Sequence, residues 1–176
     1  MNADLVIMGT KVATNATERF FGSNTVNIIK KIKNCPVLAI PDNYKFIKPE
    51  TIAFPTDFNR FYGSELEPLK ELAKLYDSEI KIIHLNKTDD ITEAQDYNLD
   101  QLKDALKNYT YSLHRVPEYN AKDEAIKQFI EDKKADILVM INYEQGFIEK
   151  LIKEPVIKNI GIHPTIPFLV IPSQGK

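Results

Sequence analysis

The sequence lacks the features that mark disulfide-bonded, zinc-binding, membrane-spanning and secreted proteins. It has one cysteine, Cys35, which excludes an intrachain disulfide and cannot form a zinc site alone. No apolar run approaches the roughly 18 residues that a membrane-spanning helix needs. The opening residues, MNADLVIMGT, have neither the basic segment nor the long apolar stretch of a signal peptide. These absences predict a cytoplasmic protein without a membrane partner.

The charge gives no reason to expect a nucleic-acid partner. The 176 residues include 23 Lys and Arg against 25 Asp and Glu, a formal net charge of −2. The opposite charges are interleaved, which is typical of solvated helix faces. The 43% of hydrophobic residues suits a globular domain. We therefore expect neither nucleic acid nor an anionic membrane to bind.

No catalytic motif is present. The sequence has no H-x-G-H and no S-G-G-x-D-S, which disfavours two classes of nucleotide-cleaving enzyme with a similar layout. Asp57 has no second acidic residue beside it, which disfavours a phospho-acceptor receiver domain. The three histidines share no metal-ligand spacing, and His84 lies in an apolar strand where we expect a packed core residue. We find no nucleophile–base pair, and expect no enzymatic activity beyond weak ATP hydrolysis at most.

From residue 51 onward, strand-like apolar runs alternate with helix-like periodicity. Ser64, followed three residues on by Glu67, predicts a capping box at the start of the first helix. The alternation predicts an α/β fold, with a five-stranded parallel sheet and helices on both faces. The expected strands are 51–54, 79–85, 109–116, 137–141 and 168–171, and the expected helices are 64–76, 91–107, 123–133 and 147–160.

Two short segments occur twice. ADLVIM at 3–8 is echoed by ADILVM at 135–140, and CPVLAIP at 35–41 by IPFLVIP at 166–172. The starts of the two pairs lie 132 and 131 positions apart, a spacing that chance similarity would not preserve. We interpret this as a duplicated domain of about 130 residues whose first copy keeps only its last strand, helix and strand. The predicted parts are a β-α-β remnant at 1–41, a linker at 42–50 and a complete domain at 51–176.

The first copy resembles the C-terminal part of a universal stress protein domain. The stretch VIMGTKVATNATERFFGSNTVNIIKKIKNCPVLAIP is similar to that family's strand ending in M-G-T, its G-x-x-G-(nine residues)-G-[S/T] loop, a helix and a CPVLVVP strand. Val12 stands where the family has its second glycine. Residues 51–172 resemble a whole domain more loosely, with Asp57 at the family's strand-end aspartate. The resemblance implies the downstream part of a tandem stress protein with the Rossmann-like, adenine nucleotide α-hydrolase-like fold.

The resemblance also implies a ligand. In the family the glycine loop binds the phosphates of ATP or a related nucleotide, and the strand-end aspartate lies near the adenosine. Unpaired N–H groups at a helix start favour an anion, and glycines let the backbone approach it. The same residues can also serve only as turn glycines and a helix cap. The candidate residues for ATP or AMP are Gly9, Thr10, Gly22, Ser23 and Asp57.

Three departures predict a degenerate nucleotide site. Val12 carries a side chain that would crowd the phosphates, and the loop and Asp57 belong to different copies. In the second copy, MINYEQGFIEKLIKEPVIKNIG, Lys153 or Glu154 falls opposite Gly22 or Ser23, and a carboxylate there would repel a phosphate. The neighbouring proline, residue 155, has no N–H to offer.

Two functions remain open. The favoured one is a stress-response module that acts through protein interaction and dimerisation with partners that the sequence does not name. The alternative is an ATP- or AMP-binding regulator that uses the glycine loop of residues 9–23. In the family the last strands of two domains pair antiparallel, which implies that 36–41 pairs with 167–172, within the chain or in a homodimer. The β-α-β remnant cannot bury both faces alone, which also favours dimerisation.

Overall fold

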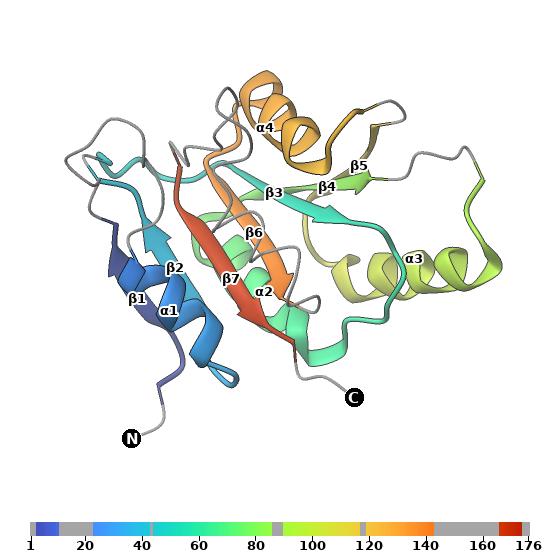
Figure 1. Ribbon diagram of the computed structural model, residues 1–176. Helices are drawn as coiled ribbons and strands as arrows, with labels where there is room; N and C mark the ends of the chain where they lie inside the picture. Colours follow the sequence, from blue (N-terminus) through green and yellow to red (C-terminus); the bar gives the residue numbers. More distant parts are fainter. Residues whose placement is uncertain are drawn as a thin grey trace. The chain divides into compact units, whose positions relative to one another are not determined.

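The structure is a computed structural model (Figure 1), and it describes residues 3–10, 23–42, 44–85, 90–116, 119–142 and 166–173. Two compact units are present. Unit 1 comprises residues 1–46 and 140–176, and unit 2 comprises residues 47–139. The expected helix at 147–160 lies outside the described residues. The predicted domain division at 42–50 stays a prediction.

Unit 1 contains the β-α-β element that the sequence predicts. Strands β1 (Val6–Gly9) and β2 (Val37–Ile40) pair parallel, with Val6 opposite Val37, and α1 (Ser23–Lys31) connects them. The last turn of α1 carries two lysines, where cations favour the helix dipole. The strand order in this unit is β1-β2-β7, followed by the end of β6.

Strand β7 (Phe168–Pro172) runs antiparallel to β2, as predicted, and the pairing forms within one chain. Leu38 lies opposite Leu169, which is its own counterpart in the repeat. On either side, Val37 lies opposite Val170 and Ala39 opposite Phe168. With the repeat offset of 131, Val37 corresponds to Phe168 and Ala39 corresponds to Val170. Each of these two pairs is therefore the repeat image of the other, and the register is symmetric about the pair of Leu38 and Leu169. Such a self-complementary arrangement is that of an isologous two-fold interface.

Unit 2 is a parallel sheet whose strand order is β6-β3-β4-β5. Together with β7, its strands account for all five that the sequence predicts between 51 and 172, and they confirm the α/β class. Strand β5 begins two residues later than expected. The elements are β3 (Thr51–Thr56), the 3₁₀ turn η1 (Gly63–Leu66), α2 (Glu67–Tyr76), β4 (Glu79–Leu85), α3 (Glu93–Leu106), β5 (Tyr111–Val116), α4 (Lys122–Lys133) and β6 (Ile137–Asn142).

The start of α2 differs from the prediction. A 3₁₀ turn precedes the helix, the N-cap of α2 is Leu66, and no side-chain cap hydrogen bond is made there. The expected capping box of Ser64 and Glu67 is therefore wrong. Pro68 in the first turn of α2 fits a helix start without a side-chain cap, because it has no N–H to satisfy.

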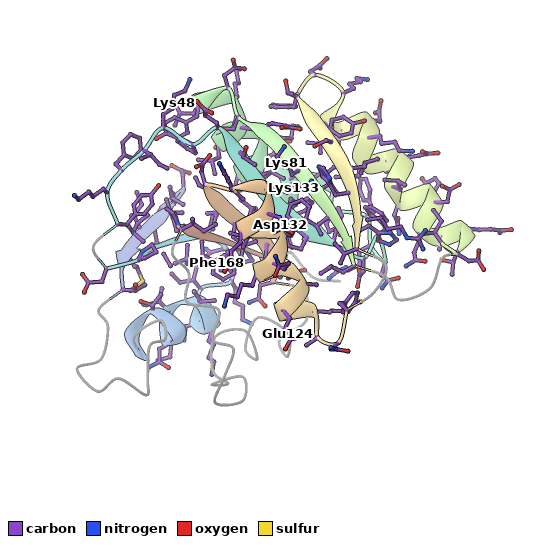
Figure 2. All side chains as sticks on the ribbon, turned by 90° about the horizontal axis from the view of Figure 1, so that it is seen from above. Lys48, Lys81, Glu124, Asp132, Lys133 and Phe168 are labelled. Atoms are coloured by element: carbon purple, nitrogen blue, oxygen red, sulfur yellow. The ribbon has the colours of Figure 1, made fainter. Side chains whose placement is uncertain are left out.

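Helices cover both faces of the unit 2 sheet. The ring of His114 on β5 meets Phe129 of α4 at 5.1 Å, so α4 covers the face that carries the side chains of His114 and Lys81. Figure 2 shows α4 along this face, with Asp132 and Lys133 labelled near its end. The opposite face carries Phe54, whose ring centroid lies 5.7 Å from that of Tyr62. Figure 1 shows α2 and α3 on the side of the sheet away from α4. None of the helices in the described ranges is both long and apolar enough to cross a membrane.

The start of β3 is fixed by a side chain from the loop before β6. The Asp136 carboxylate accepts hydrogen bonds from the backbone N–H of Glu50 at 2.8 Å and of Thr51 at 2.9 Å through the same oxygen. The backbone N–H of Asp136 in turn donates to the carbonyl of Thr51 at 2.8 Å. The parallel register follows, with Ile52 opposite Ile137 and Ala53 opposite Leu138. One aspartate therefore sets the register of two strands that are far apart in the sequence.

We expect Asp136→Ala to lower the free energy of unfolding by about 1–3 kcal/mol, because it leaves two strand-start N–H groups without their charged acceptor. Urea denaturation followed by circular dichroism measures this change. Asp136→Asn should lose less, since its amide oxygen still accepts. Asp104→Ala, at an exposed position on α3, is the matched control and should change stability little. A loss for Asp136→Ala no larger than that of the control would contradict this role.

Candidate functional site

A cavity of about 410 Å³ lies in unit 2, beyond the carboxyl ends of β3 and β4 and beside the start of α4. Ligands of open parallel sheets bind at this edge. The volume lies within the range of small-molecule sites. Polar side chains predominate in its wall, which is formed by Asp57, Asn59, Leu85, Gln95, Tyr119, Asn120 and Lys122.

The loop that carries Asp57 is held in a tight conformation by its own side chains. The Asp57 carboxylate accepts from the N–H of Asn59 at 3.1 Å, and the Thr56 hydroxyl accepts from the N–H of Phe58 at 3.1 Å. The Thr56 hydroxyl also hydrogen-bonds that of Tyr62. Phe58 has a φ of +56°, which is rare for a bulky residue, and its side chain is 2% exposed. Backbone strain of this kind persists only where the surroundings fix it, and it clusters at functional sites.

The first turn of α3 clamps the same loop. Thr92 and Gln95 form a capping box, in which each side chain accepts the other's backbone N–H. The amide of Gln95 also donates to the carbonyl of Asp57 at 2.9 Å, and the amide of Asn98 donates to the carbonyl of Phe58 at 2.9 Å. Asp57 is therefore positioned by the fold rather than left on a free loop. A positioned carboxylate can accept hydrogen bonds from ligand hydroxyl or amino groups.

Beneath this loop, His84 is the packed core residue that the sequence predicts. Its side chain is 7% exposed, and its ring stacks on Phe58 with 4.4 Å between centroids. Burial lowers the pKa of His84, and the Arg115 charge lowers it further, while Asp57 opposes both. Its Nε2 is buried, without a hydrogen-bond partner among the described residues. The neutral imidazole therefore acts as an aromatic support for the strained Phe58.

The structure places the five predicted binding residues in different parts of the chain. Asp57 lines the cavity of unit 2, whereas in unit 1 Gly9 ends β1 and Thr10 follows it. The Thr10 N–H donates to the carbonyl of Ile40 at 2.8 Å, which removes it as a donor for a phosphate. In the part of the chain that the structure describes, no atom lies within 4 Å of a Cβ placed at Gly9, so packing against these residues does not require glycine there. Ser23 begins α1, while Gly22 lies outside the described residues.

The departures that we predicted in the phosphate loop also lie outside the described residues. They are Val12 in the first copy and residues 153–155 in the second. The residue assignments for nucleotide binding therefore stay predictions. Conversely, sequence reasoning missed the other polar residues of the cavity wall. The T-x-x-Q pattern of Thr92 and Gln95 is a capping-box signal that could have placed Gln95 at the start of α3.

Among the described residues, no group of three or more histidines, cysteines, aspartates or glutamates could hold a metal ion. The lone thiol, Cys35, is buried, and burial together with the charge of Asp4 raises its pKa. A raised pKa keeps the sulfur protonated and unreactive. Cys35 thus behaves as a small buried hydrophobe.

A second cavity, of about 450 Å³, lies at the opposite end of the unit 2 sheet, where α2 and α3 end. Its wall includes Lys70, Lys74 and Asp77, and Asp77 caps α2 in the left-handed conformation with a φ of +58°. The Lys70 ammonium pairs with Glu67 at 2.7 Å. Because helix carboxyl ends carry partial negative charge, this end favours cations and opposes a phosphate.

The buried His84 predicts a pH dependence of stability. Its folded pKa is lowered, so between that pKa and about 6.5 the unfolded chain binds a proton that the folded chain does not. The contribution of neutral His84 is therefore complete above about pH 6.5 and is lost as the pH falls, with a slope of up to about 1.4 kcal/mol per pH unit. Urea unfolding of the wild type and of His84→Phe between pH 7.5 and 5 isolates this slope. Equal slopes in both proteins would contradict the assignment.

No protein-family model and no curated protein matches the chain. Solved structures do. A universal stress protein from Archaeoglobus fulgidus DSM 4304 superposes with a TM-score of 0.64 at 17% identity, covering 97% of this chain and 61% of that protein. A functionally unknown protein from Pseudomonas aeruginosa PAO1 gives a TM-score of 0.59 at 13% identity, with 96% and 62% covered.

A proposed universal stress protein from Pseudomonas aeruginosa UCBPP-PA14 also gives 0.59 at 13% identity, covering 96% of this chain and 63% of that protein. The chain thus spans about three fifths of the length of each of these proteins. At such identities the likeness concerns the fold. The chain has the fold of universal stress proteins, as the resemblance of its residues implies.

Proposed function

We propose that the chain is a stress-response module of the universal stress protein type, which acts by binding proteins rather than by catalysis. The observation that carries this proposal is the open edge of β1 in unit 1. Within the described residues β1 has a strand neighbour on one side only, β2. Leu5, just before β1, and Ile7 within it are 44% and 64% exposed. An open strand with exposed apolar side chains is a surface for another polypeptide.

Because β2 pairs with β7 within one chain, a dimer would form through a different surface from the one that the sequence predicts. The predicted contact between 36–41 and 167–172 forms within the chain, and both β2 and β7 have a strand on each side. Among the strands in the described ranges, β1 therefore has the more available edge for association between copies. We propose that two chains associate through it when no other partner is bound. Rows of unpaired N–H and C=O groups on an edge strand favour such contacts.

We expect the wild-type chain at micromolar concentration to have an average mass above the 20.2 kDa of the monomer. Ile7→Lys should return it to the monomer, because a charge on an exposed edge strand opposes pairing. Light scattering after size-exclusion chromatography measures both masses. Leu75→Lys, at an apolar position of α2 that is also exposed, is the matched control and should leave the mass unchanged. A monomeric wild type would contradict self-association.

A second function, adenine-nucleotide binding, is favoured by the cavity at Asp57. Its position at the carboxyl edge of the sheet, its volume and its polar wall fit the nucleoside part of AMP or ATP. Asp57 would accept hydrogen bonds from ribose hydroxyls or from the adenine amino group. Gln95 positions Asp57, because its side chain already bonds Thr92 and the Asp57 carbonyl. Lys122 is a cation in the cavity wall, and its ammonium group would pair with a phosphate.

We expect protein purified from cells to release AMP, ADP or ATP on denaturation, measured by anion-exchange chromatography of the supernatant. Asp57→Asn should bind at least tenfold more weakly, as expected for the loss of a charged acceptor. Asp77→Asn in the opposite cavity is the matched control, since asparagine also tolerates a left-handed conformation. Absence of nucleotide, or equal binding by Asp57→Asn, would contradict this function and leave protein binding as the proposal.

A further inference from the structure

We infer that His84 is a positioning residue for the cavity at Asp57: the proton that it takes up on acidification draws the Asp57 carboxylate out of the cavity wall and towards the imidazole. The inference rests on the proposed binding of an adenine nucleotide at this cavity and names how that binding is regulated. It follows from the place of His84 behind the wall. Leu85, the next residue of β4, and Asp57, the neighbour of the stacked Phe58, both line the cavity.

The surroundings of His84 leave one requirement unmet when the ring is charged. The side chain is 7% exposed, and Nε2 has no hydrogen-bond partner among the described residues. A charge in such a position is costly unless an opposite charge and a hydrogen-bond partner meet it. The Phe58 ring, which stacks at 4.4 Å between centroids, stabilises a cation only weakly. A protonated His84 therefore needs a carboxylate.

Asp57 is the carboxylate that acts on His84. Burial, followed by the charge of Arg115, lowers the pKa of His84, and the charge of Asp57 raises it. Arg115 lies opposite His84 on β5, and the residue opposite on β3 is an uncharged threonine. Glu79 and Lys81 of β4 lie on the other face of the sheet, because they are an odd number of residues from His84. Within the described ranges, Asp57 is thus the anion that a protonated His84 would pair with.

The same carboxylate is the acceptor that the cavity offers to a ligand. It accepts from the N–H of Asn59 at 3.1 Å, while the Asp57 carbonyl accepts from Gln95 at 2.9 Å. Because Gln95 fixes the backbone, the carboxylate can turn towards His84 about its side-chain bonds without opening the loop. This turn breaks the bond to Asn59 and removes the acceptor from the cavity wall. Proton and ligand therefore compete for Asp57.

The competition gives the pH dependence of binding a definite sign. A bound nucleoside keeps Asp57 in the wall, so it makes protonation of His84 harder than in the chain without ligand. Affinity is therefore complete above the pKa of His84 in the chain without ligand, and this pKa lies below the ordinary value. Below it, affinity falls by up to about tenfold per pH unit, because one proton must leave for each nucleoside that binds.

The first test follows the full chain without ligand by NMR, from about pH 8 to the lowest pH at which it stays folded. The His84 ring should titrate. The hydrogen-exchange protection factor of the Asn59 amide should fall about tenfold or more with the same midpoint, because its acceptor turns away. The protection factor of the Ile82 amide, inside β4, should stay constant, which separates this transition from general unfolding.

Three variants assign the transition. His84→Phe keeps an aromatic ring against Phe58 and should abolish the fall at Asn59. His114→Phe makes the same change on the other face of the sheet and is the matched control, so the fall should remain. In Asp57→Asn the His84 ring should titrate at a lower pH, because the charge that raises its pKa is gone.

Three results of this test would each overturn the inference. One is a His84 ring that does not titrate while the chain stays folded. Another is a protection factor of Asn59 that does not follow the ring, and the third is the same fall in His84→Phe as in the wild type.

Calorimetric titration with adenosine, which has no phosphate of its own to titrate, measures the consequence for binding. The wild type should lose about tenfold or more in affinity across the His84 transition, and His84→Phe should lose none of it. A pH-independent affinity in the wild type retains nucleotide binding and overturns the inference. A chain that shows the Asn59 transition but binds no adenosine at any pH overturns nucleotide binding and supports the movement of Asp57.

Discussion

The placement of β3 is the constraint on which unit 2 depends. At its start, the Asp136 carboxylate accepts hydrogen bonds from the N–H groups of Glu50 and Thr51, and so sets the register of β3 with β6. At its end, Gln95 and Asn98 hold the carbonyls of Asp57 and Phe58. The strand is thus fixed by side chains from elements about 40 and 85 residues away in the chain. The cavity at its carboxyl end derives its shape from these contacts, because they decide where Asp57 and Asn59 lie.

Much of this architecture could be predicted from the sequence, because it depends on local pattern. Buried parallel strands read as continuous apolar runs, and this is why β4 and β6 are found at the expected positions. The antiparallel pairing of β2 with β7 could be predicted from the family resemblance alone. Its symmetry about Leu38 and Leu169 reflects the repeat, since two copies of one strand form a self-complementary pair.

What could not be predicted depends on contacts between distant residues. The Ser64 and Glu67 pattern indicated a capping box, but the chain instead enters α2 through a 3₁₀ turn in which Leu66 and Glu65 are buried. Packing of that turn outweighs a cap worth about 1 kcal/mol. The true capping box, at Thr92 and Gln95, has a second role at the carbonyl of Asp57 that no local pattern contains. Likewise, Tyr119 and Lys122 join the cavity only because α4 begins beside the strand ends.

Recognition of a strand by a strand gives little selection by itself, since every polypeptide offers the same N–H and C=O groups. The contact between β3 and β6 shows how one side chain adds direction to such pairing. A carboxylate before a strand can accept two consecutive N–H groups only from a segment that turns into the sheet beside it, as residues 50 and 51 do beside Asp136. In a parallel pair that turn arrives at the amino end of the strand, where the aspartate stands. In an antiparallel pair the same position meets a strand that is leaving the sheet. Asp136 therefore marks the direction of the strand that pairs beside it, before any side chain of that strand is distinguished.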